Sequence, residues 1–337
     1  MLLALSLITA GIALRQADRV HFSLGRPHAG GAAQLIALQR ARAHDWTPVL
    51  LVAGQWVQII GWWMLAAQGL PGAVAAATGV AVQFRHLQEI SHHAIHGVLA
   101  RSRRVNHLLA ALGAHYPLGF APVAVRRRRH VRDHHPNATL AADPNLAELA
   151  EAGLRPGVGA LRFAAAVVHP LTARGLRATL TALAANLRPR PGRYGGPAAV
   201  TLVLVAAYAA GGWAAVLAGV LLPRLLLYPL LAWWSLIAEH TWFDPEHRTG
   251  TAAEIEAGRC LRLYPHNRVL ATLAATTWLP YGDLHHYAHS AHPGLRWNYL
   301  PALERHLPRP HFTPAALIAG PTSVARRHHT ALTRANS

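Results

Sequence analysis

Histidine is the residue type in this chain whose number and spacing point to chemistry. The sequence holds 24 His but only 14 Asp and Glu together, so a metal centre here would be built mainly from imidazole nitrogens. Imidazole suits zinc, copper, iron and nickel, whereas magnesium and calcium prefer oxygen ligands. Three clusters of histidine each lie beside an apolar stretch: His92 with His96; His130 with His134 and His135; and His286 with His289.

The first cluster lies in RHLQEISHHAIHG, residues 85–97. His92 and His96 are four residues apart, a spacing that places both rings on one face of a helix. Two imidazoles so placed can reach one metal ion or two adjacent ions, whereas His93 points elsewhere. For this pair alone, the commoner explanation is an amphipathic face with histidines reaching towards water.

The second cluster lies in RRRRHVRDHHPN, residues 126–137. His130 precedes His134 by four residues, which again predicts one helical face, and Pro136 ends the helix after His135. Asp133 is a candidate for holding a ligand imidazole by its free N–H, as metal-bound histidines generally require. The alternative is a polybasic strip for anionic lipid headgroups, but neutral histidines would add little to such a strip.

The third cluster lies in PYGDLHHYAHSAHPGLRWNYLP and holds His285, His286, His289 and His292. Between the second and third clusters, His240 stands in AEH at the end of an apolar stretch. Each cluster alone is ambiguous. Several histidine clusters at membrane boundaries, however, together predict a metal site, because the topology brings their segments to the same side of the membrane.

Composition indicates that a membrane positions these clusters, since 52% of the residues are hydrophobic and only 14% are charged. Residues 46–84 are nearly free of charge and are broken by a turn signal at 68–72, so they predict two membrane helices. Residues 197–238 predict a second hairpin, with its turn either at Gly211-Gly212 or at Pro223-Arg224. If the turn lies at the glycines, Arg224 falls within a helix, where a charge is costly and usually functional or paired.

Arginine-rich blocks at 101–104, 126–132 and 155–193 all lie between the two hairpins, and basic residues mark the cytoplasmic side. We therefore predict an all-α, multi-pass integral membrane protein. It has about four transmembrane helices in two hairpins, interfacial helices, and a cytosolic helical cap that gathers the histidines on the cytoplasmic side. Residues 108–125 contain Gly and Pro and predict an interfacial helix, because a fifth span would separate the first two clusters. Residues 140–193 predict a cytosolic helical segment with loops.

The whole chain, 1–337, is predicted to form one membrane-embedded domain, with an interfacial segment at 1–45 and a loose tail at 308–337. Within that N-terminal segment, residues 1–14 predict either a half-buried interfacial helix or a disordered start. The net charge of +18 does not indicate nucleic-acid binding, because the basic residues sit in juxtamembrane blocks. The single cysteine, Cys260, excludes an intramolecular disulfide and a CxxC motif, and is predicted to be a core or interfacial thiol.

The segments HHAIH, HVRDHH and HHYAHSAHPG resemble the three histidine boxes of membrane fatty acid desaturases and the related hydroxylases and carotenoid ketolases. The likeness runs from about residue 46 to 307 and includes AEH at His240 and PGLRWNYLPAL. It implies a four-span helical protein with a cytosolic cap and two iron ions. The ligands it implies are His92, His96, His130, His134, His135, His240, His286 and His289.

The sequence departs from that pattern at two points. The family's third box usually ends in two adjacent histidines, and here Ser290 takes the second place; the first box usually has an acid where His93 stands. His292, or His285 beside the ligands, is a candidate for the missing nitrogen. Alternatively, one iron keeps an open position for water or substrate.

The function that the resemblance implies is O2-dependent oxidation of an unactivated C–H bond in a lipid or acyl chain, with fatty acyl desaturation favoured. The alternative is a hydroxylase or ketolase acting on an alkyl, carotenoid or other apolar substrate. Two Fe ions and O2 are expected, with no bound organic cofactor, and electrons are expected from a separate ferredoxin or cytochrome b5-type donor with its reductase. Arg224, Arg296 and Trp234 are candidate substrate contacts, although packing or lipid contact is the commoner role for such residues.

Two other classes of function remain as alternatives. A histidine-rich metal transporter would place its ligands within the membrane spans, and the predicted spans contain almost none. A zinc-dependent intramembrane protease would need a hydrolytic acid beside its ligands, and the sequence has no HExxH motif.

Overall fold

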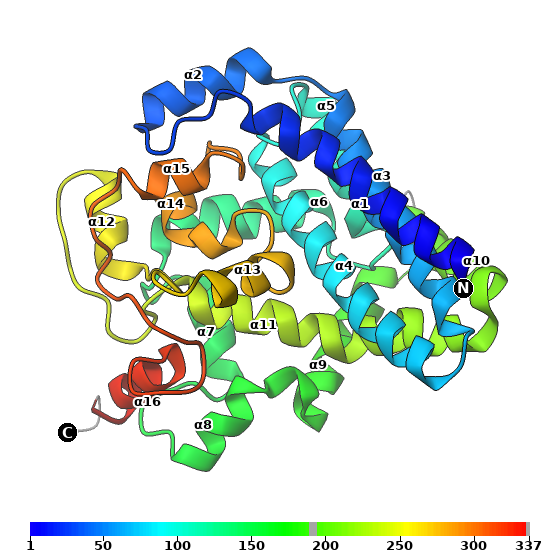
Figure 1. Ribbon diagram of the computed structural model, residues 1–337. Coiled ribbons are helices and arrows are strands. Elements are labelled where there is room, and N and C mark those ends of the chain that lie inside the picture. Colours follow the sequence, from blue (N-terminus) through cyan, green and yellow to red (C-terminus); the bar gives the residue numbers. More distant parts are fainter. Residues whose placement is uncertain (189–193, 335–337) are drawn as a thin grey trace. The chain divides into compact units, whose positions relative to one another are not determined.

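The computed structural model describes residues 1–188 and 194–334, and the regular secondary structure of that part is helical (Figure 1). Its described residues form no strand, only isolated bridges such as the one between His240 and Cys260. The prediction of an all-α chain is confirmed. The end of the segment predicted as cytosolic, residues 189–193, lies outside the described residues.

The α-helices of the described residues differ greatly in length, from five residues to 27. They are α1 (Leu2–Ser23), α2 (Ala32–Arg42), α3 (Trp46–Ala66), α4 (Leu70–His96), α5 (Arg103–Ala110), α6 (Val123–Arg127), α7 (Pro144–Glu151), α8 (Ala160–Val167), α9 (Ala173–Leu187), α10 (Gly195–Val216), α11 (Tyr228–Glu239), α12 (Ala252–Arg259), α13 (Arg268–Thr276), α14 (His286–Ala291), α15 (Leu300–Glu304) and α16 (Val324–Arg334).

Short turns of other helix types join or extend these helices. The π-helical turns are η1 (Ala111–His115), η2 (Arg128–His134), η5 (Leu217–Leu221) and η6 (Pro223–Leu227). The 3-10 turns are η3 (His135–Asn137), η4 (His169–Leu171) and η7 (Asp283–His285).

The chain forms two compact units. The first unit comprises Met1–Gly25, Arg40–Arg126 and Leu176–Leu231, and the second comprises Arg26–Gln39, Arg127–Gly175 and Ala232–Ser337. The first unit contains α1, α3, α4, α5 and α10, and the second contains η2, α7, α8 and the helices from α12 to α16.

In the first unit, α3 and α4 form the predicted first hairpin. Gly69 at the turn has φ +90°, a value that favours glycine, and α4 begins directly after it. The helix α1 runs along α3 (Figure 1). A Cβ built on Gly54 of α3 would come within 2.6 Å of the carbonyl oxygen of Gly11 in α1, so the two backbones touch at these glycines.

The second predicted hairpin breaks at Gly211-Gly212, the first of the two predicted turn positions. Gly212 has φ 62° and ψ −154°, outside the helical region and accessible mainly to glycine. Pro223 instead opens the π-helical turn η6, so the helix continues through it and Arg224 lies within helical structure. The Arg224 Nε donates to the Leu118 carbonyl at 2.6 Å, and its guanidinium lies over the ring of Phe120. The guanidinium is therefore held by a backbone hydrogen bond and a cation–π contact.

Two helical stretches among the described residues are long and apolar enough to cross a membrane. They are Trp46–Ala66, and Gly195–Glu239, which is 45 residues long and includes the break at the glycines. Residues 108–125 form no continuous helix: α5 and η1 end at His115, and α6 starts at Val123. A fifth span across this segment is therefore not formed.

Both ends of the chain are more regular than the sequence suggests. The first helix continues to Ser23, well beyond the apolar residues 1–14, so the alternative of a disordered start is wrong. The sequence predicts a loose tail at 308–337, whereas the structure has the helix α16 there, with Val324 and His328 buried. Residues 335–337 lie outside the described residues.

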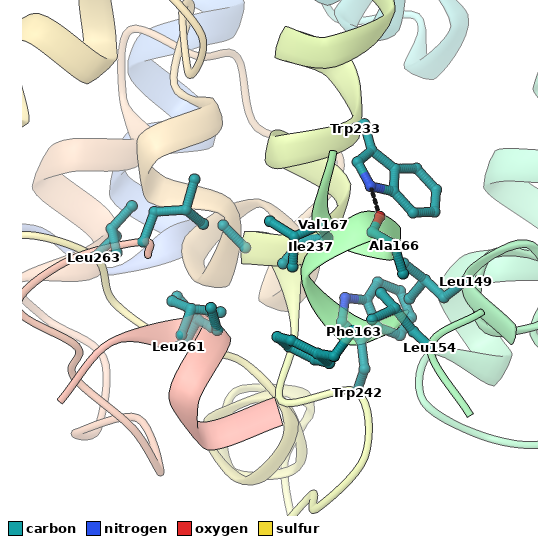
Figure 2. Packing of buried hydrophobic residues seen from close by; sticks show 14 of the residues in the cluster. Leu149, Leu154, Phe163, Ala166, Val167, Trp233, Ile237, Trp242, Leu261 and Leu263 are labelled. Carbon is teal, nitrogen blue, oxygen red and sulfur yellow. Dashed lines mark hydrogen bonds between the residues drawn. The ribbon is translucent and has the colours of Figure 1, made fainter. Parts of the chain in front are cut away.

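An apolar core holds the second unit together (Figure 2). Phe163 and Val167 of α8 pack with Ile237 of α11 and with Trp242, which follows it. The indole N–H of Trp233 donates to the Ala166 carbonyl at 2.9 Å, which ties α11 to α8 (Figure 2). This core holds the end of α11 in place, and His240, a residue of the candidate site, follows directly after it.

Candidate metal centre

The first group of candidate ligands in the second unit consists of His134, Glu239, His240 and His286. Each offers one ligand atom, and these atoms all lie within 4.8 Å of one another. They come from three places in the chain: the end of η2, the end of α11 and the start of α14. The three histidines are 0%, 0% and 5% exposed, so water has little access to the group.

The second group in this unit consists of His130, His135 and His289, whose ligand atoms also lie within 4.8 Å of one another. The Nε2 atoms of His130 and His135 are 3.1 Å apart. The reason is local: η2 is π-helical, and five residues separate these two histidines, close to one turn of that wider helix. The α-helical spacing predicted from the sequence would pair His130 with His134, but the structure assigns those two to different groups.

Asp143 holds the ring of His134. The Nδ1–H of His134 donates to the two carboxylate oxygens at 3.0 and 3.1 Å, and both side chains are fully buried. The other ring nitrogen, Nε2, is buried and has no hydrogen-bond partner. Because buried polar atoms are nearly always partnered, a nitrogen held this way among other imidazoles fits a metal ligand.

Acids also lie beside other histidines of the third box. The Oδ1 of Asp283 is 3.7 Å from Nδ1 of His286, while its Oδ2 accepts a hydrogen bond from Ser235 at 2.6 Å. The Nδ1–H of His285 donates to Glu304 at 2.5 Å. The ring of His285 is therefore held by an acid, which also pairs with Arg262 at 2.6 Å.

The surroundings of His240 favour the neutral form of its ring. Burial lowers the pKa of His240 well below its usual value, and the nearby His286 and His134 add to the effect. Its Nε2 is 3.3 Å from Nε2 of His286, and its Nδ1 is 3.3 Å from the Cys260 sulfur. A neutral imidazole is the form that binds a metal ion, so this environment suits a ligand.

In the first unit, His92 and His96 lie on the last turns of α4 with ring centroids 5.0 Å apart, as their spacing predicts. The helix ends directly after them, because Gly97 adopts the left-handed conformation (φ 78°) of a helix C-cap. Glu89, one turn earlier, accepts a hydrogen bond from Nδ1 of His92 and pairs with Arg85 at 3.0 Å. The ring of His93 is buried, with Nε2 4.0 Å from Glu89.

The remaining predicted residues lie away from these groups or in structural contacts. The Asp133 carboxylate is about half exposed and 4.0 Å from Arg128, so it does not hold His134. His292 is half-buried and belongs to neither ligand group of the second unit. Arg296 is fully buried and donates to Asn298, and the Trp234 indole donates to the Val167 carbonyl at 3.2 Å.

Sequence reasoning missed Glu239 and all the acids that hold the rings. Glu239 stands next to His240 in AEH, and Glu89 and Asp283 each precede a ligand histidine by three residues, so local spacing would have found these three. Asp143 is nine residues from His134 with a turn between them, and no spacing rule identifies it.

Comparison with known protein families gives one match, to the fatty acid desaturase family, over residues 67–316. Among curated proteins and solved structures, no match is found. The matched region covers most of the chain and contains the histidines of all three boxes together with His240. The chain belongs to the fatty acid desaturase family.

Proposed function

We propose that this protein is a membrane diiron enzyme that uses O2 to oxidise an unactivated C–H bond of an acyl or lipid chain. Fatty acyl desaturation is the reaction we favour. The observation that carries the proposal is the presence of two adjoining histidine groups in the second unit, buried or half-buried, within a chain of the fatty acid desaturase family. The electrons would come from a separate protein of the ferredoxin or cytochrome b5 type.

The ligand assignment follows the two groups. His134, His240 and His286, with Glu239, would hold one iron ion, and His130, His135 and His289 would contribute to the second. As part of the proposal, His92 and His96 of α4 complete the centre, as the family resemblance implies. His292 remains a candidate for the nitrogen that Ser290 does not supply.

The bound iron would supply the redox chemistry that activates O2, and the protein's own residues prepare its site. Imidazole nitrogens are ligands that suit iron, and the histidines supply most of the ligand atoms in both groups. Asp143 fixes one tautomer of His134 by accepting its Nδ1–H. The burial of His134, His240 and His286 keeps water from the ligand atoms.

The membrane part of the proposal has four spans in two hairpins, with the histidines on the cytoplasmic side. The α3–α4 hairpin and the break at Gly211-Gly212 support this topology. The arginine blocks between the hairpins indicate that this part of the chain lies in the cytoplasm. A site at the boundary of the bilayer favours a substrate whose reacting part is apolar, and Arg224, Arg296 and Trp234 stay candidates for contacting it.

Metal analysis of the purified protein tests the proposal. We expect about two iron ions per chain, because each of the two ligand groups would hold one ion. His134→Ala should lower iron content and abolish turnover, whereas His266→Ala, at an exposed position outside the groups, should change neither. Stoichiometric zinc in a protein produced with iron in excess, with no iron bound, would reject the diiron enzyme.

Product analysis identifies the reaction. The enzyme would be combined with a reductase system and candidate acyl substrates, and the products separated by mass. Loss of two hydrogens identifies a desaturase, whereas gain of one oxygen identifies a hydroxylase. Absence of any O2-dependent product from apolar substrates, in a protein shown to contain iron, would contradict the proposed substrate class.

A further inference from the structure

The helix α12 and the Cys260 that follows it lie directly against His240, although no sequence motif marks this segment as part of a site. The helix α12 begins with a capping box between Thr251 and Glu254. At its other end, the N–H of Thr241 donates to the Arg259 carbonyl at 2.9 Å, and His240 and Cys260 form an antiparallel bridge. Backbone contacts therefore fix the end of α12 beside the candidate ligand.

The side chains continue this contact as a chain of hydrogen bonds. The Cys260 sulfur lies 3.3 Å from Nδ1 of His240 and 3.3 Å from Oε2 of Glu256. In the second of these contacts the thiol is the donor and a carboxylate oxygen is the acceptor. The S–H then donates to Glu256, and the sulfur accepts the Nδ1–H of His240.

This arrangement determines which nitrogen of His240 is available to a metal ion. With the proton on Nδ1, the lone pair is on Nε2, the atom that faces His286 at 3.3 Å. Without an acceptor, Nδ1–H would be a buried donor with no hydrogen bond, an arrangement that is costly. The ring could then take the other tautomer, in which Nε2 carries the proton and binds no metal.

Glu256 connects the same chain to the second histidine box. Its second oxygen pairs with Arg259, and both side chains are largely buried. The Arg259 guanidinium also donates to the carbonyl of Ala138 at 3.1 Å and to that of His135 at 3.4 Å. One network thus reaches the ring of His240 and the backbone of His135, a member of the other ligand group.

We propose that Cys260 and Glu256 are positioning residues that hold His240 in its metal-binding tautomer, with Arg259 anchoring the pair to the second histidine box. The inference rests on the proposed metal-binding function. It gives His240 a thiol partner, whereas His134 has a carboxylate partner. Sulfur is a weaker acceptor than a carboxylate, so the two ligands of one group differ in their hydrogen-bond support.

The test compares three variants of the full-length protein: Cys260→Val, Cys260→Ala and Cys260→Ser. Valine is somewhat larger than cysteine and alanine somewhat smaller, and neither side chain has a hydrogen-bonding group, so together they separate the loss of the thiol from a change in packing; serine restores a donor and acceptor. Binding of Fe(II) and of Co(II) alone is titrated, and the absorption spectrum of the Co(II) form is recorded. Circular dichroism and thermal unfolding confirm that each variant folds.

We expect the valine and alanine variants to bind metal about 10- to 100-fold more weakly, the usual effect of removing such a partner. Their Co(II) spectra should change, while the serine variant keeps the wild-type spectrum and most of the affinity. Wild-type affinity and spectrum in a folded valine or alanine variant would overturn the inference, as would equal losses in all three variants. If the wild-type protein itself binds neither metal, the proposed function is rejected. If the wild type binds metal and the valine and alanine variants bind it equally well, only the role of Cys260 is rejected.

Discussion

At the scale of single residues, the ligand histidines differ in how their second nitrogen is held. His92 lies against Glu89, His134 against Asp143, and His240 against Cys260. Partners of this kind fix the tautomer and the orientation of the ring before a metal ion arrives, and removing one typically costs 10- to 100-fold in metal affinity. Asp143 is the partner with the best-defined geometry, since both of its oxygens lie near the same N–H.

Asp143→Asn tests this role. Asp143 also caps α7 by accepting the N–H of Asn145 at 2.9 Å, and asparagine caps helices as well as aspartate does. The fold should therefore persist. A neutral amide supports the His134 N–H less well than a carboxylate, so we expect the metal affinity to fall about 10- to 100-fold. The measurement is titration with Fe(II), with thermal unfolding as the check on folding.

The matched control for this variant is Asp133→Asn on the neighbouring segment. The Asp133 carboxylate is about half exposed and lies 4.0 Å from Arg128. An exposed ion pair contributes about 0–1 kcal/mol, so this variant should bind metal like the wild type. A larger loss in the Asp133 variant than in the Asp143 variant would show that the carboxylate predicted from the sequence is the one that matters.

At the scale of elements, α1 and α3 depend on glycines at their contact. A Cβ on Gly54 would meet the Gly11 carbonyl at 2.6 Å, and one on Gly61 would meet the Ala4 carbonyl at 2.8 Å. Backbone atoms cannot move aside as the end of a side chain can. Small residues of this kind allow apolar helices to approach closely within a membrane, so this contact orders α1 against the first candidate span.

Gly54→Val should separate α1 from α3. Overpacking a tight contact typically costs about 1–3 kcal/mol, so we expect a lower midpoint of thermal unfolding in detergent and faster proteolysis of α1. The control is Gly159→Ala, because a Cβ at Gly159 meets nothing within 4 Å. If the midpoints of the two variants agree, the glycine contact does not hold α1 in place.

The helix α16 carries a pH-sensitive contact. His328 is 1% exposed and its ring N–H donates to the Ile237 carbonyl at 3.0 Å. Burial lowers the pKa of His328 to about 4 from the ordinary 6.5. Between these two values the unfolded chain binds a proton that the folded chain does not, so folding stability falls as pH drops from 6.5 towards 4.

His328→Gln should flatten this dependence. Glutamine can donate to the same carbonyl and does not titrate in this range. A tenfold change in proton affinity is worth about 1.4 kcal/mol, so the wild type should lose up to about 3 kcal/mol between pH 6.5 and 4 from this group. Thermal unfolding and hydrogen exchange of α16, recorded across this range, provide the measurement. Equal slopes for the variant and the wild type would contradict the prediction.

Elements also determine how far the sequence could predict the site. The spacing of His92 and His96 was sufficient to predict that their rings lie close together, because α4 is a regular helix up to its glycine cap. The second box was predicted less well, since η2 is π-helical and divides His130 and His134 between two groups. Asp143 was not predictable, because a turn and a helix start bring it to His134 and neither fixes a sequence distance.

At the scale of the whole molecule, the apolar composition and the three boxes were enough to predict an all-α chain of this family. The number of spans is harder, because α4 combines an apolar first half with Arg85, Glu89 and the histidines. Within residues 1–188 and 194–334, length and hydrophobicity mark only α3 and the stretch Gly195–Glu239 as candidate spans. The four-span proposal therefore depends on whether α4 returns across the bilayer.

Cysteine labelling in intact cells decides this point. In a Cys260→Ser background, single cysteines would replace Gln68 at the α3–α4 turn and Arg103 after α4, both exposed. If α4 crosses, a membrane-impermeant maleimide should label position 68 in intact cells and position 103 only after lysis, because the proposed topology places the arginine block there in the cytoplasm. A cysteine at Trp213, 67% exposed beside the glycine break, should behave like position 68. Labelling of positions 68 and 103 from the same side would leave α4 outside the bilayer and reject the four-span topology.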